Sequence, residues 1–114
     1  ETVPLDSLAA RVPALLEEIQ AGLMAQARAF LEANIRDASD YQGFKDILEN
    51  QRGFVRAPWC GGEACEDRIK IETMATIRVI PIDGPIDGDG EKALGPCVAC
   101  GEKGESVAYF ARAY

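Results

Sequence analysis

The chain has 114 residues, 47% of them hydrophobic and 27% charged, a composition ordinary for one globular domain. Its net charge of −7 argues against a free-standing nucleic-acid-binding protein, whose affinity depends on clustered Lys and Arg. No segment reaches the ~20 apolar residues needed to cross a bilayer, so we expect a soluble chain without a membrane partner. Because the first residue is Glu1 and not Met, we interpret the chain as part of a longer polypeptide.

A long amphipathic helix is predicted over residues 8–35. Apolar residues recur there at spacings of three and four, and Asp6 or Ser7 precedes them as the N-cap. Such a helix is roughly 40 Å long, whereas a domain of this size has a radius of gyration of about 13 Å. We therefore expect the helix either to bend or to extend beyond the domain as a strut against a neighbour. Pro13 is expected to kink it unless it lies in the first turn.

The rest of the chain alternates between helical and strand patterns. Ser39 and Gln42 form a capping-box pattern ahead of a shorter helix, which Gly53 is expected to terminate. The other predicted elements are a strand tail at 1–5, strands at 54–59, 76–82 and 106–114, and a helix at 66–72. Together they predict one α+β domain spanning 1–114: a two-layer sandwich of a mixed sheet with helices on one face.

Four cysteines form the strongest chemical pattern in the sequence. They occur as two close pairs, Cys60-Gly-Gly-Glu-Ala-Cys65 and Cys97-Val-Ala-Cys100, with 31 residues between Cys65 and Cys97. Close pairs allow one backbone turn to supply two soft ligands, and four thiolates suit one tetrahedral zinc ion. Gly61, Gly62 and Gly101 permit the tight turns that such a site needs. Because all four positions are thiolates, the predicted site is structural and has no open position for substrate.

Two other interpretations of the cysteines remain open at this point. The four thiols can form disulfides in three connectivities, although the helical pattern is not typical of a small disulfide scaffold. Alternatively, Cys97 and Cys100 form a thioredoxin-like redox pair. Redox pairs normally precede a helix, whereas Gly101, Gly104 and a predicted strand follow this one.

Other candidate groups have simpler explanations. The chain contains no histidine, which excludes Ser-His-Asp and Cys-His catalysis, and it has no phosphate-binding loop ending in Gly-Lys-Ser or Gly-Lys-Thr. The segment 87–91 is rich in Asp and Gly but lacks the spacing of an EF-hand, so we interpret 83–95 as a solvated loop. Trp59 is expected to pack on the first cysteine pair. Arg78 is interpreted as solvent-facing, with a carboxylate or phosphate partner as the alternative.

Several stretches carry a resemblance to a known family. They are Gly53-Phe-Val-Arg-Ala-Pro-Trp-Cys60, Cys65-Glu66 with Ile69-Lys70, Ala75-Thr-Ile-Arg78-Val-Ile-Pro81, Cys97-Val-Ala-Cys100-Gly101 and Val107-Ala-Tyr-Phe-Ala-Arg-Ala-Tyr114. In these stretches and in their order along the sequence, the chain closely resembles the C-terminal domain of prolyl-tRNA synthetases of the archaeal/eukaryotic-like type. The resemblance covers essentially all 114 residues.

The resemblance implies a class II aminoacyl-tRNA synthetase, a cytoplasmic homodimer that joins proline to proline tRNA with ATP and magnesium. Its catalytic and anticodon-binding domains precede the present region. The family's C-terminal domain is an α+β unit that carries zinc on cysteines matching Cys60, Cys65, Cys97 and Cys100. A terminal tyrosine matching Tyr114 is thought to reach toward the catalytic domain. We therefore expect a non-catalytic domain that braces the others. The alternative is a free-standing zinc-ribbon-like module that recruits a protein partner.

Overall fold

The computed structural model describes residues 1–82 and 95–113, so the acidic segment 87–91 and Tyr114 lie outside the described residues. Two compact units, Glu1–Ala33 and Asn34–Tyr114, make up the chain and are described separately. Within the described residues, no helix combines the length and the apolar character that a bilayer crossing requires.

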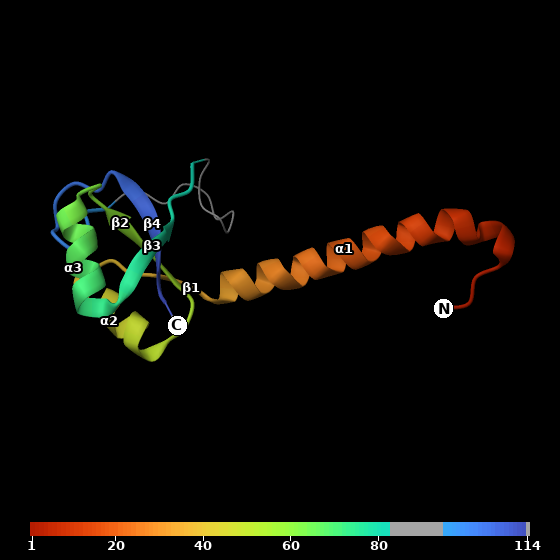
Figure 1. Cartoon of the computed structure of the whole chain (residues 1–114), viewed down its shortest axis with the longest axis horizontal. Coiled ribbons are helices and arrows are strands. Elements are labelled where there is room, and N and C mark those ends of the chain that lie inside the picture. Colours follow the sequence, from red (N-terminus) through yellow and green to blue (C-terminus); the bar gives the residue numbers. More distant parts are fainter. Residues whose placement is uncertain (83–94, 114) are drawn as a thin grey trace. The chain divides into compact units, whose positions relative to one another are not determined.

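The first unit is a helix preceded by a single tight turn. A 3₁₀ turn at Leu5–Ser7 leads directly into helix α1, Leu8–Ala33 (Figure 1). The expected strand tail at 1–5 is therefore wrong, and the helix ends two residues before the predicted position. Pro13 lies inside α1 without ending it. None of the side chains of α1 is buried, including its apolar ones.

The second unit contains a four-stranded mixed sheet in the order β1-β2-β4-β3. β1 pairs with β2 in parallel, and β4 pairs antiparallel with both β2 and β3. The last strand of the sequence thus lies in the interior of the sheet. The bounds are Ile35–Asp37 for β1, Phe54–Trp59 for β2, Ala75–Val79 for β3 and Ser106–Arg112 for β4.

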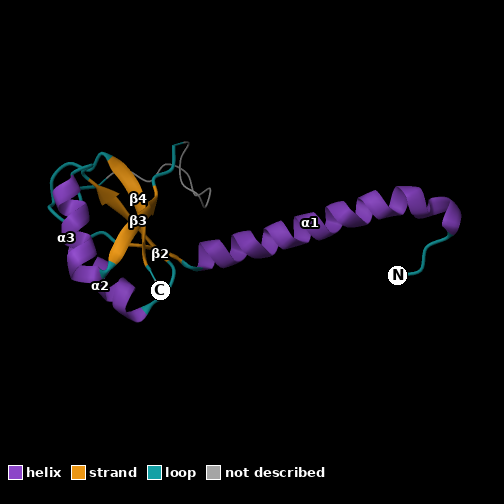
Figure 2. Ribbon diagram, in the orientation of Figure 1, coloured by secondary structure: helices purple, strands orange, loops and turns teal. Residues whose placement is uncertain are grey.

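Two helices, α2 (Tyr41–Asn50) and α3 (Glu63–Thr73), cover one face of this sheet (Figure 2). Between the layers, Phe44 of α2 and Phe110 of β4 meet edge to face at 5.1 Å, and both are fully buried. Ile69 of α3 lies in the same core. The two-layer α+β architecture predicted from the sequence is confirmed.

Several predicted boundaries differ from the structure. The N-cap of α2 is Asp40, whose carboxylate accepts a hydrogen bond from the Gly43 amide at 2.6 Å, so the Ser39 capping box does not form. The helix ends at Asn50, before Gly53. Gly53 instead turns the chain into β2 with φ of 114°, and a Cβ there would collide with the Asn34 carbonyl oxygen.

The strand β1 was not predicted. It has only three residues, and it exists because β2 supplies hydrogen-bonding partners from further along the chain. Its last residue, Asp37, forms a two-contact ion pair with Arg56 of β2: Nε to Oδ1 is 2.6 Å and Nη2 to Oδ2 is 3.1 Å. The Arg56 side chain is only 5% exposed, so this carboxylate neutralises a buried charge.

Candidate metal centre

The four cysteine sulfur atoms gather at one point of the second unit. The Sγ atoms of Cys60, Cys65, Cys97 and Cys100 all lie within 4.8 Å of one another. All four cysteines are free thiols, so the disulfide alternative has no support here. The sulfurs of the two sequence-distant pairs therefore share one cluster, as the spacing predicted.

The pairing of β2 with β4 brings the two cysteine pairs together. The two strands run antiparallel, with Trp59 opposite Ser106, so the end of β2 lies beside the start of β4. Cys60 directly follows β2, and the 97–100 turn shortly precedes β4. The pairing of β2 with β4 thus brings together two cysteine pairs that 31 residues separate in the sequence.

The first pair is held by a turn and a helix start. Gly61, with φ of 81°, reverses the chain after Cys60, and α3 begins at Glu63, three residues before the predicted start. Cys65 consequently lies in the first turn of α3, close to Cys60. The Trp59 indole N–H donates to the Gly62 carbonyl at 3.2 Å and so ties this turn to the strand.

The second pair lies in a compact turn fixed by main-chain hydrogen bonds. The Cys97 amide donates to the Glu102 carbonyl at 2.7 Å, and the Gly101 amide donates to the Cys97 carbonyl at 2.9 Å. The Val98 amide donates to the Pro58 carbonyl at 3.0 Å, which joins the turn to the end of β2. The turn is thus positioned by backbone contacts that need no metal.

The surroundings affect the thiols unequally. Burial raises the pKa of Cys65 to about 12, and hydrogen bonding with Cys60 and Cys100 adds to the rise. Burial also acts to raise the pKa of Cys97, but the Cys100, Ala99 and Cys60 amides outweigh it and lower the pKa to about 7. Cys97 is only 2% exposed, whereas Cys100 is exposed. The turn therefore makes the most buried sulfur easier to ionise than an ordinary cysteine.

Arg68 of α3 contacts the turn of the second cysteine pair, the end of α3 and the start of α2. Its Nη1 donates to the Ala99 carbonyl at 2.9 Å, and its Nε donates to the Glu72 carboxylate at 3.1 Å. The guanidinium also lies over the Tyr41 ring, 4.7 Å from the centroid. Tyr41 in turn donates its hydroxyl to Glu72 at 2.7 Å. Local sequence patterns do not reveal the contacts of Arg68 with Tyr41 and Ala99, because these residues are 27 and 31 positions away in the chain.

The geometry suits a four-coordinate thiophilic ion. A tetrahedron with metal–sulfur bonds of about 2.3 Å has edges of about 3.8 Å, so sulfurs already within 4.8 Å need only small shifts. The four-sulfur donor set fits zinc by ligand type, and it leaves no open position for water or substrate. Glu63 and Glu66 lie in the first turn of α3, where acidic groups suit the helix dipole.

Comparison with known proteins assigns the chain to a family. The family model described as the C-terminal domain of prolyl-tRNA synthetase matches residues 41–114. The chain belongs to the prolyl-tRNA synthetase family. It is 44% identical over 114 residues to the proline–tRNA ligase of Rubrobacter xylanophilus and 41% identical over 112 residues to that of Agathobacter rectalis. These matches cover 100% and 98% of the chain, and 22% of each relative.

A solved structure agrees with the family assignment. The crystal structure of prolyl-tRNA synthetase from Cryptosporidium parvum, complexed with L-proline and AMP, superposes with a TM-score of 0.80 at 31% identity. The match covers 98% of this chain and 23% of that one. This member of the prolyl-tRNA synthetase family therefore spans about a fifth of the length of its relatives.

Proposed function

We propose that Cys60, Cys65, Cys97 and Cys100 hold one structural zinc ion. The observation that carries the proposal is the approach of four free sulfurs to within 4.8 Å from two separate segments. Bound there, the ion cross-links the start of α3 and the end of β2 to the turn before β4. Structural zinc sites supply about 10–16 kcal/mol of apparent binding free energy, comparable with the whole stability of a domain, about 5–15 kcal/mol.

Elemental analysis of the purified chain tests the zinc site directly. We expect one zinc per chain, and four thiols that react with a thiol reagent only after a chelator has removed the metal. Zinc well below one equivalent, or four thiols that react fully before chelation, contradicts the proposal. A redox dithiol at Cys97 and Cys100 would instead show two thiols that oxidise and reduce reversibly.

We further propose that the chain is the C-terminal part of an enzyme that joins proline to proline tRNA with ATP and magnesium. This proposal is supported by sequence identities of 44% and 41% to two proline–tRNA ligases over nearly the whole chain. The catalytic and anticodon-binding domains then belong to the remaining four-fifths of the polypeptide, as do the homodimer contacts. By this proposal the enzyme works in the cytoplasm.

Within that enzyme the present domain braces its neighbours and does not itself react. Its 114 residues contain no histidine, and the proposed metal site is closed to substrate. The first bracing element is α1, whose Leu16 and Phe30 are 61% and 73% exposed. An apolar helix face of this kind gains stability only when another surface covers it. The preceding domains of the same polypeptide are the proposed cover.

The second bracing element is Tyr114, which lies outside the described residues. Deletion of Tyr114 from the full-length synthetase is expected to lower aminoacylation while zinc content stays at one per chain. A matched deletion variant with wild-type kcat/KM contradicts the role. Loss of zinc in the same variant would show damage to the fold and not loss of a contact.

A further inference from the structure

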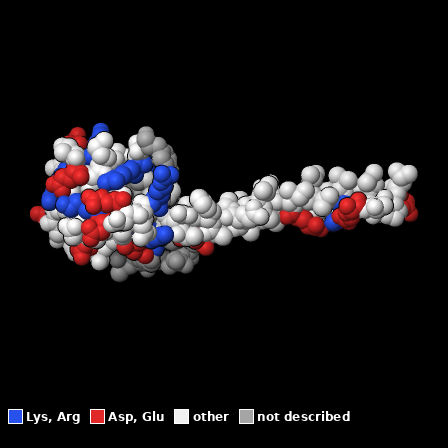
Figure 3. Space-filling view, turned by 90° about the horizontal axis from the view of Figure 1, so that it is seen from below, with Lys and Arg blue, Asp and Glu red and all other residues white. Residues whose placement is uncertain are grey.

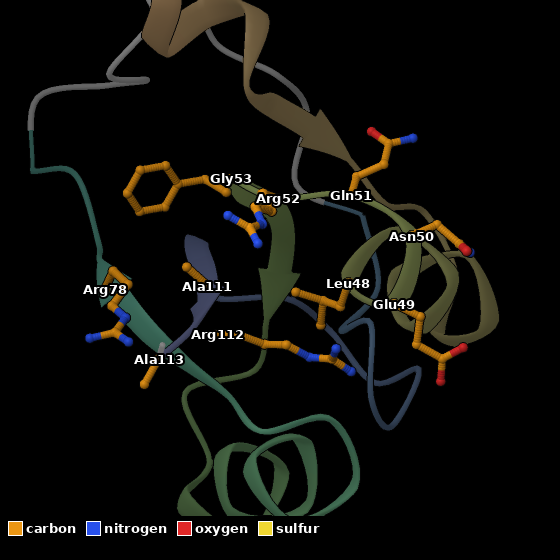
Figure 4. Close-up of a pocket in the computed structure, with 11 residues that line it drawn as sticks. Leu48, Glu49, Asn50, Gln51, Arg52, Gly53, Arg78, Ala111, Arg112 and Ala113 are labelled. Atoms are coloured by element: carbon orange, nitrogen blue, oxygen red, sulfur yellow. The ribbon is translucent and has the colours of Figure 1, made fainter.

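A pocket on the second unit, remote in sequence from the cysteines, gathers three arginines. It has a volume of about 570 Å³ and is bordered by the end of α2, the turn into β2, and strands β3 and β4 (Figure 4). Arg52, Arg78 and Arg112 line it together with one acidic residue, Glu49. Among the lining residues that the structure describes, three positive charges and one negative charge give a net +2, in a chain whose net charge is −7.

Each of the arginines is placed by a feature of the backbone. Arg52 precedes the Gly53 turn, and Arg78 lies where the register between β3 and β4 shifts, at Ile77 and Val79. Such irregularities redirect side chains out of the regular alternation. Arg112 is anchored by its Nε, which donates to the Thr73 carbonyl at 2.7 Å. Three separate segments thus each contribute one arginine to the lining of one pocket.

Arg52 and Arg78 form no ion pair with the described part of the chain. Within residues 1–82 and 95–113, no carboxylate forms an ion pair with Arg52 or Arg78, and both side chains are exposed. Arginine is the side chain best suited to two-point recognition of a carboxylate or a phosphate. The pocket therefore has the chemistry of an anion-binding site.

The pocket lining combines apolar surface with charges of both signs, which favours a peptide ligand over a nucleic acid. Leu48, Phe54 and Ala111 contribute apolar surface to the pocket, which aliphatic side chains of a peptide can cover. Glu49 lies on the border, and acidic side chains lie beside the basic ones over the same unit (Figure 3). A polyanion such as RNA would meet these carboxylates on approach. An acidic peptide segment with aliphatic side chains matches both the charge and the apolar surface.

We propose that this arginine pocket, defined by Arg52, Arg78 and Arg112, docks an acidic and apolar protein segment. The segment comes from the remaining part of the synthetase polypeptide, and this choice of source rests on the proposed function. Glutamate or aspartate carboxylates of the segment pair with the guanidinium groups, and its aliphatic side chains cover Leu48 and Phe54. The pocket then serves as a third bracing contact, in addition to α1 and Tyr114.

The binding chemistry is tested on the zinc-loaded chain by NMR titration with defined probes. They are a blocked pentapeptide of alternating glutamate and leucine, its glutamine analogue, inorganic phosphate, and an oligouridylate with the same number of charges. We expect the glutamate peptide to shift the Arg52 and Arg78 side-chain signals and the amides of 48–54 most strongly. Tighter binding of the oligouridylate, or equal binding of the glutamine peptide, overturns the proposal.

Variants make the result specific to the pocket. Arg52→Gln with Arg78→Gln is expected to weaken the glutamate peptide at least about tenfold, since each charge-assisted hydrogen-bonding group is worth roughly that factor. Lys70→Gln, an exposed cation on α3 outside the pocket, is the matched control and should bind like the wild type. Both arginines are exposed, so folding should persist, as circular dichroism can check. Unchanged binding in the double variant overturns the assignment.

The source of the segment is tested by arginine modification in the full-length synthetase without tRNA. Phenylglyoxal, with mass spectrometry as the readout, should modify Arg52 and Arg78 readily in the isolated chain and slowly in the full-length enzyme. Arg68, half exposed beside the cysteines, serves as the internal reference. Equal reactivity of Arg52 and Arg78 in both proteins refutes an internal segment. Neither experiment measures zinc or aminoacylation, so a failure here is distinct from a failure of the proposed function.

Discussion

Arg68 donates a hydrogen bond from Nη1 to the main-chain oxygen of Ala99, at 2.9 Å. Ala99 lies between Cys97 and Cys100, and Arg68 lies one helical turn after Cys65. The bond therefore connects the two halves of the sulfur cluster without using a sulfur atom. The guanidinium of Arg68 also places a positive charge near the cysteine cluster. With four thiolates and one Zn²⁺, that cluster would carry a net charge of −2.

Arg68→Gln is expected to weaken zinc binding about tenfold, within the range of about 10–100-fold typical of groups that orient metal ligands. The physical reason is that the 97–100 turn loses its tie to α3 and the cluster loses a compensating charge. Competition with a zinc chelator of known affinity measures the change. Lys70→Gln on the same helix should leave the affinity unaltered, and an unaltered affinity in Arg68→Gln contradicts the prediction.

Cys100→Ala is expected to lower the melting temperature of the zinc-loaded chain by more than about 10 °C, because a lost ligand removes several kcal/mol of metal binding. The same substitution should change the melting temperature of the chelated, metal-free chain very little, since Cys100 is exposed. Comparison of the two melting curves separates metal binding from packing. Equal effects with and without zinc argue against a metal ligand.

Glu72 provides a test of pH dependence. Hydrogen bonds from Tyr41, followed by those from Arg68, hold the pKa of Glu72 below its usual value near 4.5. The folded state thus binds this proton less readily than the unfolded state. The stabilisation is fully present above pH 4.5 and is lost as the pH falls through the lowered folded-state pKa.

The difference in stability between wild type and Glu72→Gln should accordingly shrink as the pH is lowered from 6 to 3. Urea unfolding of the metal-free chain measures it and avoids the separate effect of acid on zinc binding. Glu17→Gln, an exposed glutamate of α1, is the control. A difference that stays constant over this range is inconsistent with the predicted role of Glu72.

Asp37→Asn is expected to reduce the free energy of unfolding by about 2 kcal/mol. The buried Arg56 guanidinium would lose its charged partner, and the loss is below the 3–5 kcal/mol typical of fully buried pairs because Asp37 is 54% exposed. Chemical denaturation gives the value. A double-mutant cycle with Arg56→Met tests the pairing. The double variant should lose less free energy of unfolding than the two single variants lose in total, and a loss equal to that total would show that the two residues are not coupled.

The sequence predicted those features that depend on local pattern. The spacing of Cys60, Cys65, Cys97 and Cys100 was sufficient to predict one cluster, because close pairs restrict how sulfurs can be presented. The apolar period of 8–31 predicted α1, with an error of two residues at its end. The β-branched residues of 76–79 likewise identified β3.

Features that depend on distant partners were not predictable. β1 is three residues long, and nothing in Ile35–Asp37 indicates a strand until β2 is beside it. The start of α3 was missed because Gly62 has no side chain with which to cap the helix. The arginine pocket depends on a register shift at Arg78 and on the sheet order, and single-residue patterns encode neither.

The order of the sheet has a consequence for how the domain forms during synthesis. β4 lies between β2 and β3 but is translated after both. Until residues 106–112 leave the ribosome, β2 and β3 have no strand to join them, and the 97–100 sulfurs have only just been made. The sheet and the four-sulfur cluster must therefore be completed in one late step. A ribosome that stalls before Ser106 leaves a nascent chain in which β2 and β3 both lack the strand that pairs with them, a target for chaperones and proteases.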